Sequence, residues 1–402
     1  MSRFGAVEGS NRAVVVGGGG HVGLPLSIVL ANSGIETYAF DISEEAVSTI
    51  NSGRMPFVED DAEVNLVNAL EARKLWATTN PECVSKSDYV IVVIGTPVDE
   101  HLSPNPNSVL SSILELESHL NENQVILLRS TVFPGVTKRV FEELRKRFPK
   151  IRVAYCPERI IEGQALKEIK TLPQIIGAYD EESFYAAKAL FDKIGVESLH
   201  VEPEEAELAK LFTNVWRYIK FASANQFWMM ANDLGVDYEE VRKAISYKYP
   251  RAADLPSAGF TAGPCLFKDT MQLSALVQQN FPLGHSAMMI NEGTPGYLVR
   301  RIKEKYDLRN TTVGILGMAF KGNVDDTRSS LAYKLRKLLM FEAKEILICD
   351  PFTKDRRNSD LKKVLEESDL IIIGAPHSEY KDMRIEKPVI DIWGMRGDGV
   401  LV

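Results

Sequence analysis

One cysteine has neighbours suited to covalent chemistry. Cys265 lies in the stretch AGPCLFKDT, residues 262–270, shortly before Lys268 and Asp269. A nearby lysine favours the thiolate, and a carboxylate at this spacing can act as a base. The alternative is a small packing residue, because free cysteines are commonly buried. We expect that packing role for the other three cysteines, Cys83, Cys156 and Cys349.

Two polar residues lie four positions apart in a segment with helical periodicity. The segment 203–235 begins at Pro203 and ends at Gly235, which can stop a helix, so it predicts a helix of roughly 45 Å. Lys210 and Asn214 then share one face of that helix. In isolation either would be read as an ordinary exposed residue, but together they can point into a cleft between domains.

A glycine-rich motif opens the first third of the chain. Gly18, Gly20 and Gly23 fit G-x-G-x-x-G between an apolar run at 13–16 and a helical pattern at 24–31. We expect the three glycines to permit a tight turn, an approach to pyrophosphate and close helix packing, in that order. Four consecutive glycines could also form a flexible loop, but the order of strand, glycines and helix favours nucleotide binding.

An acidic residue ends the next expected strand. Asp41 follows TYAF and lies 18 residues after Gly23. A carboxylate at this position accepts hydrogen bonds from ribose hydroxyls and repels a 2′-phosphate. The motif therefore predicts NAD rather than NADP as the cofactor.

Two threonines follow later strands of the same pattern. Thr96 lies next to the end of SDYVIVVIGTP and Thr131 ends VILLRST. Carboxyl ends of parallel strands line the ligand crevice, so both can touch cofactor or substrate. Capping of the following helices is the alternative, and the two roles can coexist.

The last hundred residues repeat the pattern without the glycines. Apolar runs in TTVGILGMAF, EILICDP and SDLIIIGAP predict a second, smaller α/β unit at about 305–402. Its loop FKGNVDDTRSS carries Lys321 and Arg328, which can hold a phosphate ligand through side chains. A solvated surface turn is the alternative.

The long helix carries more large apolar residues than one internal face needs. We expect the excess to serve a second copy of the chain, through Trp216, Phe221, Phe227, Trp228, Met229 and Met230.

Composition limits the class of protein. The chain has 402 residues, 45% hydrophobic and 25% charged, with a net charge of -8, which disfavours nucleic acid as a partner. The cysteines form no CxxC pair, so no metal is expected. The apolar runs are too short for a membrane span and the N-terminal stretch MSRFGAVEGSNR lacks an apolar signal region, so we expect a cytoplasmic protein.

These patterns predict an α/β protein with two Rossmann-like doubly wound parallel-sheet domains joined by a long central helix. The expected domains are residues 1–200 for NAD, residues 201–300 for the central helix and dimerisation, and residues 301–402 for a second phosphate ligand, which the resemblance described next implies is a nucleotide sugar (UDP).

The chain resembles the UDP-glucose/GDP-mannose dehydrogenase family from about Val14 to Trp393. The resemblance rests on seven motifs in the same order: GGGGHVGLPL, IGTPV, STVFPG, CPERIIEG, AELAKLFTN, GPCLFKD and FKGNVDDTRSS. It implies oxidation of the C6 hydroxyl of a UDP-sugar to a carboxylate, with two NAD.

The resemblance also implies roles for individual residues. Cys265 would form a thiohemiacetal and then a thioester, and Lys210 and Asn214 would stabilise the oxyanions. Asp269, assisted by Thr131, would orient or deprotonate water, and Glu162 would take part in thioester hydrolysis. Arg251 would reach the sugar of a neighbouring subunit, and a homodimer is expected.

The expected contacts fall into two sets. The cofactor set is Gly18, Gly20, His21, Val22, Gly23, Asp41, Thr96, Thr131, Lys268 and Arg328. The substrate set is Glu158, Arg159, Ile160, Lys210, Asn214, Arg251, Phe260, Gly263, Lys321 and Arg328.

The sequence departs from the family pattern in two places. Ala262 and Pro264 flank the glycine before the cysteine, and Pro264 removes an N–H. The stretch PERIIEG combines features of N-acetylhexosamine and UDP-glucose members, so both sugars stay open. A single-step NAD-dependent β-hydroxyacid dehydrogenase and a non-catalytic nucleotide-sugar binding protein are the alternative functions.

Overall fold

The structure, a computed structural model, describes residues 11–96, 99 and 105–402. Pro97 of the predicted strand end GTP, and the N-terminal stretch up to Ser10, lie outside the described residues. The chain forms two compact units, of which the first ends at Thr213 and the second begins at Asn214. Each unit has its own sheet and is described separately.

The first unit is built on a sheet of eight strands among the described residues, in the order β3-β2-β1-β4-β5-β6-β7-β8. Its neighbouring strands are parallel, except that β6 and β7 are antiparallel. The strands are β1 (Arg12–Val16), β2 (Glu36–Phe40), β3 (Leu75–Thr78), β4 (Tyr89–Val92), β5 (Val125–Leu128), β6 (Arg152–Tyr155), β7 (Gln174–Gly177) and β8 (Ser198–Val201). The helices are α1 (Gly23–Asn32), α2 (Glu44–Asn51), α3 (Ala62–Glu71), α4 (Glu82–Ser85), α5 (Ser108–Glu115), α6 (Val136–Arg147), α7 (Ala165–Thr171) and α8 (Glu181–Ile194), with a 3-10 turn at Glu117–His119.

Both faces of this sheet are covered, which explains the continuous apolar runs in its strands. Along β1, Ala13 and Val15 pack with α1, α3, α7 and α8, whereas Val14 and Val16 pack with α5 and α6. Every residue of β4, β5 and β6 is buried. The strand ends that carry the motif residues are therefore fixed by a core on both sides.

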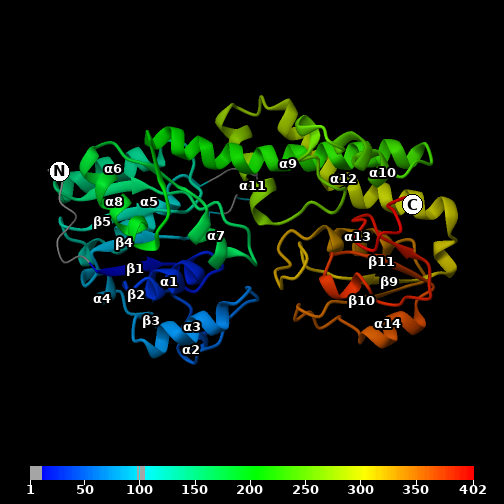
Figure 1. The fold of residues 1–402 in the computed structure, drawn as a ribbon, viewed down its shortest axis with the longest axis horizontal. Coiled ribbons are helices and arrows are strands. Elements are labelled where there is room, and N and C mark those ends of the chain that lie inside the picture. Colours follow the sequence, from blue (N-terminus) through cyan, green and yellow to red (C-terminus); the bar gives the residue numbers. More distant parts are fainter. Residues whose placement is uncertain (1–10, 97–98, 100–104) are drawn as a thin grey trace. The chain divides into compact units, whose positions relative to one another are not determined.

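A single helix of 31 residues, α9 (Pro203–Asp233), continues from the first unit into the second. Figure 1 shows this helix without a break. Glu204 and Glu205 lie in its first turn, where negative charge suits the helix dipole. The predicted long helix is confirmed. The prediction that Trp228 belongs to a dimer surface is wrong, because Trp228 is buried in the second unit and its Nε1 donates to the carbonyl of Val400 at 2.8 Å.

The second unit contains a smaller parallel sheet, in the order β10-β9-β11-β12 among the described residues. The strands are β9 (Thr312–Leu316), β10 (Glu345–Cys349), β11 (Leu370–Ile373) and β12 (Val389–Ile390). The helices are α10 (Tyr238–Ser246), α11 (Pro264–Leu276), α12 (Pro282–Lys305), α13 (Leu331–Leu339) and α14 (Leu361–Glu367), with 3-10 turns at Pro250–Ala252, Leu308–Asn310 and Ser378–Tyr380.

This sheet too has apolar residues on both faces. Successive residues of β11 face opposite cores, because Leu370 and Ile372 join one core whereas Ile371 and Ile373 join another. The predicted fold class, two Rossmann-like sheets and a long helix, is confirmed. None of the helices in the described residues has the length and apolar character needed to cross a bilayer.

Candidate active site

The glycine-rich turn after β1 has the form of a pyrophosphate cradle. Gly17 has a φ of 85°, and a Cβ there would lie 2.3 Å from the carbonyl oxygen of Val93. The tight turn that we assigned to Gly18 therefore falls on Gly17, whereas Gly18 must be small because its Cβ would lie 2.6 Å from the Cα of Ala39. At Gly20 the nearest contact would be 3.6 Å away, which leaves the backbone approachable. These residues, with His21 and Val22 directly before α1, fit a dinucleotide.

Asp41 lies directly after β2, beside the glycine turn. One carboxylate oxygen accepts from the N–H of Gly19 at 2.9 Å and the other accepts from the N–H of Ser43 at 3.0 Å. A carboxylate oxygen has two lone pairs, so each retains acceptor capacity for a ribose hydroxyl. The geometry fits the predicted selection of NAD.

The ends of β4 and β5 are tied together next to that turn. Thr96 donates its hydroxyl hydrogen to the carbonyl of Thr131 at 2.6 Å. Ser130 accepts from the N–H of Ile94 and donates to its carbonyl, both at 2.8 Å. Thr131 is thus held at the carboxyl edge of the sheet, where ligands of doubly wound folds bind.

The stretch PERIIEG forms a turn after β6 that two buried groups anchor. Glu158 bonds to Arg129 and accepts from the N–H of Arg159 at 2.8 Å and of Ile160 at 3.1 Å. Burial alone would raise the pKa of Glu158, but the Arg129 guanidinium and these N–H groups hold it below its ordinary value. Arg129, which also donates to Gln174 at 2.8 Å, was not identified from the sequence.

A second anchor holds the other end of this turn. Glu59 accepts from the N–H of Gly163 at 2.9 Å and of Ala165 at 2.6 Å, and burial raises its pKa. Between the two anchors, the carboxylate of Glu162 lies 3.4 Å from Nε2 of His21. The structure therefore brings Glu162, predicted to be catalytic, and His21, predicted to bind the cofactor, together within the first unit.

Glu207 on α9 has a role that the sequence did not indicate. Its carboxylate accepts from the N–H of Gly135 at 2.6 Å and from the N–H and hydroxyl of Thr137 at 2.8 and 2.6 Å. It therefore caps the start of α6 instead of acting on the dipole of its own helix. Burial raises the pKa of Glu207.

In the second unit, α9 and α11 bring three polar residues together. Asn214 donates to a carboxylate oxygen of Asp269 at 2.5 Å, and Nζ of Lys268 lies 3.2 Å from the other oxygen. Asp269 is fully buried, and its carboxylate contacts Asn214 through a hydrogen bond and Lys268 through an ion pair. Lys210, one turn before Asn214 on α9, belongs to the first unit and is also buried. An amide nitrogen carries two N–H groups, so Asn214 keeps a second donor for a ligand.

Cys265 is the second residue of α11 and is exposed, in contrast to the three other cysteines, which are buried. Pro264 occupies the first position, where the missing N–H would have had no helical partner. The following N–H groups belong to the positive end of the helix and stabilise negative charge on sulfur. Asp269 lies four residues along the same helix, so it shares the face of Cys265.

The loop that leads into α11 is fixed by close packing. The N–H of Gly259 donates to the side chain of Asn225 at 2.9 Å, and the ring of Phe260 meets Trp393 edge to face at 6.2 Å. Gly263 has a φ of 103°, and a Cβ there would lie 2.8 Å from the ring of Phe320. The loop before Cys265 thus packs against Phe320, the residue next to Lys321.

The two cations predicted to bind phosphate lie in the loop between β9 and α13. Lys321 is partly buried, and Arg328 is exposed and donates through Nε and Nη2 to Asp326 at 2.8 and 2.5 Å. Arg251, in the 3-10 turn after α10, is exposed and stacks over Tyr249 at 5.2 Å.

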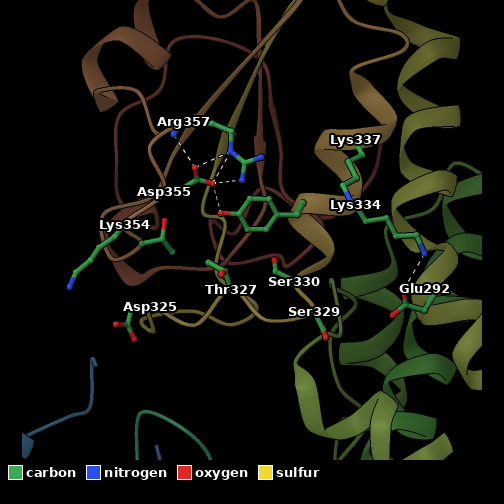
Figure 2. A pocket seen from close by; sticks show the side chains of 12 residues that line it. Glu292, Asp325, Thr327, Ser329, Ser330, Lys334, Lys337, Lys354, Asp355 and Arg357 are labelled. Carbon is green, nitrogen blue, oxygen red and sulfur yellow. Dashed lines mark hydrogen bonds and ion pairs between the residues drawn. The ribbon is translucent and has the colours of Figure 1, made fainter. Parts of the chain in front are cut away.

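An open pocket of about 890 Å³ borders the same loop (Figure 2). Its lining consists of Glu292, Asp325, Thr327, Ser329, Ser330, Tyr333, Lys334, Lys337, Thr353, Lys354, Asp355 and Arg357. Much of its charge is internally paired, because Lys334 bonds to Glu292 at 3.1 Å and Arg357 to Asp355 at 2.6 Å. The pocket includes neither Lys321 nor Arg328, although Asp325, Thr327, Ser329 and Ser330 of its lining belong to the motif FKGNVDDTRSS.

Comparisons with known proteins cover most of the chain. The NAD binding domain of the UDP-glucose/GDP-mannose dehydrogenase family matches residues 12–195, its central domain matches residues 204–293, and its UDP binding domain matches residues 314–395.

Several relatives are similar over nearly their whole length. A UDP-N-acetyl-D-mannosamine dehydrogenase of Methanocaldococcus jannaschii is 30% identical over 381 residues, which cover 93% of this chain and 88% of the relative. The solved UDP-D-ManNAc dehydrogenase of Pyrococcus horikoshii has a TM-score of 0.86 at 28% identity, and 94% of each chain is covered. The solved UDP-glucose dehydrogenase of Pyrobaculum islandicum has a TM-score of 0.86 at 25% identity and covers 97% of this chain and 95% of its own.

The family match includes a domain for NAD and a domain for UDP, and the glycine cradle and Asp41 fit the first of these. The chain therefore belongs to the UDP-glucose/GDP-mannose dehydrogenase family and is an NAD-dependent nucleotide-sugar dehydrogenase.

Proposed function

We propose that the protein oxidises the C6 hydroxyl of a UDP-N-acetylhexosamine to the carboxylate in two steps through a covalent intermediate on Cys265. The observation that carries this proposal is the exposed cysteine at the start of α11, on the same helix as the buried Asp269, which Asn214 and Lys268 contact. A single-step dehydrogenase has no use for a nucleophile there.

NAD, when bound, accepts one hydride from C6 in each of the two oxidations. In the first oxidation the hydroxyl also loses a proton, and the product is the C6 aldehyde. Lys210 and Asn214 donate hydrogen bonds to the C6 oxygen while it carries negative charge. Lys210 is buried, so water weakens a hydrogen bond from it only slightly.

The sulfur of Cys265 then adds to the aldehyde carbon, and the aldehyde oxygen takes up a proton to give a thiohemiacetal. Loss of the second hydride and of the hydroxyl proton leaves a thioester. Water adds to the thioester carbonyl, the carbon–sulfur bond breaks, and the products are the uronate and the free thiol. Asp269, with Thr131 and Glu162, orients the water or takes its proton.

The UDP end of the substrate is assigned to the second unit. Lys321 and Arg328 donate charge-assisted hydrogen bonds to the diphosphate. Arg328 is held toward its loop by Asp326, an acidic residue that is 7% exposed. A phosphate competes with the carboxylate of Asp326 for the guanidinium of Arg328. Arg328 therefore contributes to binding, although its side chain is not held in advance in the position that the phosphate requires.

The names of the relatives suggest the sugar. Relatives from Methanocaldococcus jannaschii and Pyrococcus horikoshii, at 30% identity, are UDP-N-acetyl-D-mannosamine dehydrogenases, and one from Ralstonia nicotianae, at 26%, is an NDP-N-acetyl-D-galactosaminuronic acid dehydrogenase. We therefore propose UDP-N-acetyl-D-mannosamine as the first substrate to test, followed by UDP-N-acetyl-D-galactosamine, UDP-N-acetyl-D-glucosamine and UDP-glucose.

A second copy of the chain is the proposed partner of α9. The helix carries four large apolar residues that are about half exposed: Phe212, Trp216, Phe227 and Met230. Burial of these side chains by a twofold-related copy would remove them from water. The three domains at 1–200, 201–300 and 301–402 and the cytoplasmic location stay predictions.

The decisive experiment counts NADH formed per sugar nucleotide consumed, with mass spectrometry of the product. We expect two NADH and a uronate for one of the UDP-sugars. One NADH with an aldehyde product would favour the single-step dehydrogenase, and no NADH with any of the four sugars would favour a binding protein. Cys265→Ser is expected to stop turnover and to leave NAD binding unchanged, because the cofactor cradle lies in the other unit.

A further inference from the structure

A buried pair of side chains fixes the loop that carries Lys321 on both sides of that lysine. On one side, a carboxylate oxygen of Asp350 accepts from the N–H of Met318 at 2.5 Å and of Ala319 at 3.0 Å. On the other side, Nδ1 of His377 accepts from the N–H of Asn323 at 2.8 Å. The contacts come from the loops after β10 and β11, so three strand ends meet at this loop.

The two side chains also bond to each other. Nδ1 of His377 accepts a backbone N–H, so the proton of the neutral imidazole resides on Nε2, which donates to Asp350 at 3.0 Å. Neither side chain is exposed. The second oxygen of Asp350 accepts from the N–H groups of Phe352 and Thr353 at 2.9 and 3.0 Å. The carboxylate therefore accepts five hydrogen bonds, all from the protein.

The corresponding place in the first unit is used differently. Asp350 follows β10 as Asp41 follows β2, next to the first strand of each sheet. The carboxylate of Asp41 accepts two hydrogen bonds from backbone N–H groups, so it can accept further ones from a ribose. The carboxylate of Asp350 already accepts five hydrogen bonds from the protein. The loops after β9 and β11 also touch, because a Cβ on Gly322 would lie 2.3 Å from the carbonyl oxygen of Pro376. In the second unit, contacts within the protein thus use the acceptor positions that Asp41 keeps for a ribose in the first.

We propose that Asp350 and His377 are positioning residues for the sugar nucleotide: they hold the backbone on both sides of Lys321, so that its ammonium group meets the diphosphate. The proposal rests on the role given to Lys321 under Proposed function. Neither residue touches the substrate. A preformed loop saves the cost of ordering Lys321 when the ligand binds, so loosening the loop weakens binding without changing the chemistry.

The test compares dissociation constants for UDP, measured by calorimetry, with KM for NAD and kcat. UDP serves as the probe because its binding does not depend on which sugar is the substrate. We expect His377→Leu to weaken UDP binding about tenfold, with KM for NAD and kcat close to wild type. His377→Asn, whose amide oxygen can replace Nδ1 as the acceptor for Asn323, is expected to recover part of the loss. A merely structural role would move all three parameters together or none.

Two further variants guard against misfolding. Asn323 is exposed, has a φ of 58° and accepts from Ser378 through its side chain, so Asn323→Gly removes that tie without straining the backbone. It is expected to weaken UDP binding about threefold. Tyr380→Phe is the matched control, because Tyr380 is buried beside His377 but is not bonded to the loop with Lys321 in the contacts of the described residues. It is expected to bind UDP as the wild type does.

A double-mutant cycle with Lys321→Ala separates this proposal from the one on which it rests. If His377 acts through Lys321, adding His377→Leu to Lys321→Ala causes little further loss. An equal loss in both backgrounds would overturn the proposal. If Lys321→Ala weakens UDP binding but His377→Leu and Asn323→Gly do not, the positioning role alone is wrong. If Lys321→Ala has no effect on UDP binding, the role of Lys321 itself is wrong.

Discussion

Replacement of Gly263 by alanine tests whether the backbone before Cys265 has to be as the structure places it. Gly263 has φ 103° and ψ 158°, a region that is essentially restricted to glycine and costs other residues about 1–3 kcal/mol. The new Cβ would also lie 2.8 and 2.9 Å from two atoms of the Phe320 ring, so either the ring or the loop must move.

If this strain is relieved by displacing Cys265 or Lys321, kcat/KM for the sugar nucleotide should fall by about 5- to 150-fold. Steady-state kinetics with the sugar nucleotide and with NAD measure the effect, and a thermal unfolding scan reports the loss of stability. KM for NAD should hardly change, because the glycine cradle belongs to the other unit.

Two controls separate strain from contact. Gly235→Ala places an alanine at a φ of 70° with no heavy atom within 4 Å of the Cβ, so it should lower stability and leave kinetics unchanged. Phe320→Ala combined with Gly263→Ala removes the ring contact and retains the backbone strain, so it separates the two costs. Wild-type kinetics for Gly263→Ala would refute the reasoning that this turn sets the position of the thiol.

Three further predictions concern charged residues. Asp41→Ala should narrow the preference for NAD over NADP, because it removes the repulsion of a 2′-phosphate; equal kcat/KM for both cofactors in the wild type would contradict this. Arg328→Ala should raise KM for the UDP-sugar roughly ten- to a hundredfold. Arg328→Lys should recover only part of this loss, because an ammonium cannot give two parallel hydrogen bonds. If Arg328→Ala weakens NAD binding and leaves KM for the UDP-sugar unchanged, the assignment of the UDP-sugar to the second unit and of NAD to the first is wrong. Burial alone would raise the pKa of Asp350, but hydrogen bonds from His377 and from backbone N–H groups lower it to about 2. The Asp350 carboxylate thus contributes about 2 kcal/mol to the free energy of unfolding above pH 4, and this contribution is lost as the pH falls through the folded pKa near 2. Between pH 4 and pH 2 the wild type should therefore lose more unfolding free energy than Asp350→Asn. An equal loss in both proteins would contradict the assignment.

The fold could be predicted because its local signals agree. Apolar runs without alternation marked strands buried on both faces, and the glycine turn and the long periodic helix marked the elements between them. The turn itself was assigned one residue late. The motif has one register, Gly18, Gly20 and Gly23, but it does not tell which glycine makes the turn; the φ of 85° and the contact with Val93 assign the left-handed position to Gly17.

The supporting residues of the candidate site could not be predicted, because their partners are far away in the sequence. Glu59 binds backbone groups 104 and 106 residues away, and Arg129 binds Glu158 29 residues away. Glu207 on α9 caps α6 through backbone groups 72 and 70 residues away. No periodicity or motif reports such contacts, since they depend on which strand ends meet at one edge of the sheet.

The same limit explains the error at Trp228. An apolar-rich helix indicates that more than one face is covered, but it does not tell which residues are covered by the chain itself. Trp228 is buried against Tyr297 and bonded to Val400, whereas Trp216 on the same helix is 58% exposed. Only the packing of the C-terminal residues against α9 shows that Trp228 is buried by the chain itself and that Trp216 is not.

The central claim, a covalent intermediate on Cys265, is tested most directly by mass spectrometry of enzyme quenched in acid during turnover with NAD and UDP-N-acetyl-D-mannosamine, or with whichever UDP-sugar of the panel is oxidised. Thiol esters survive acid, and peptide mapping separates Cys265 from the three buried cysteines. The account predicts a peptide containing Cys265 whose mass is increased by the acyl group of the UDP-sugar, with none of this mass on the other cysteines. Formation of two NADH per sugar without any adduct on Cys265, or with undiminished turnover in Cys265→Ser, would contradict it.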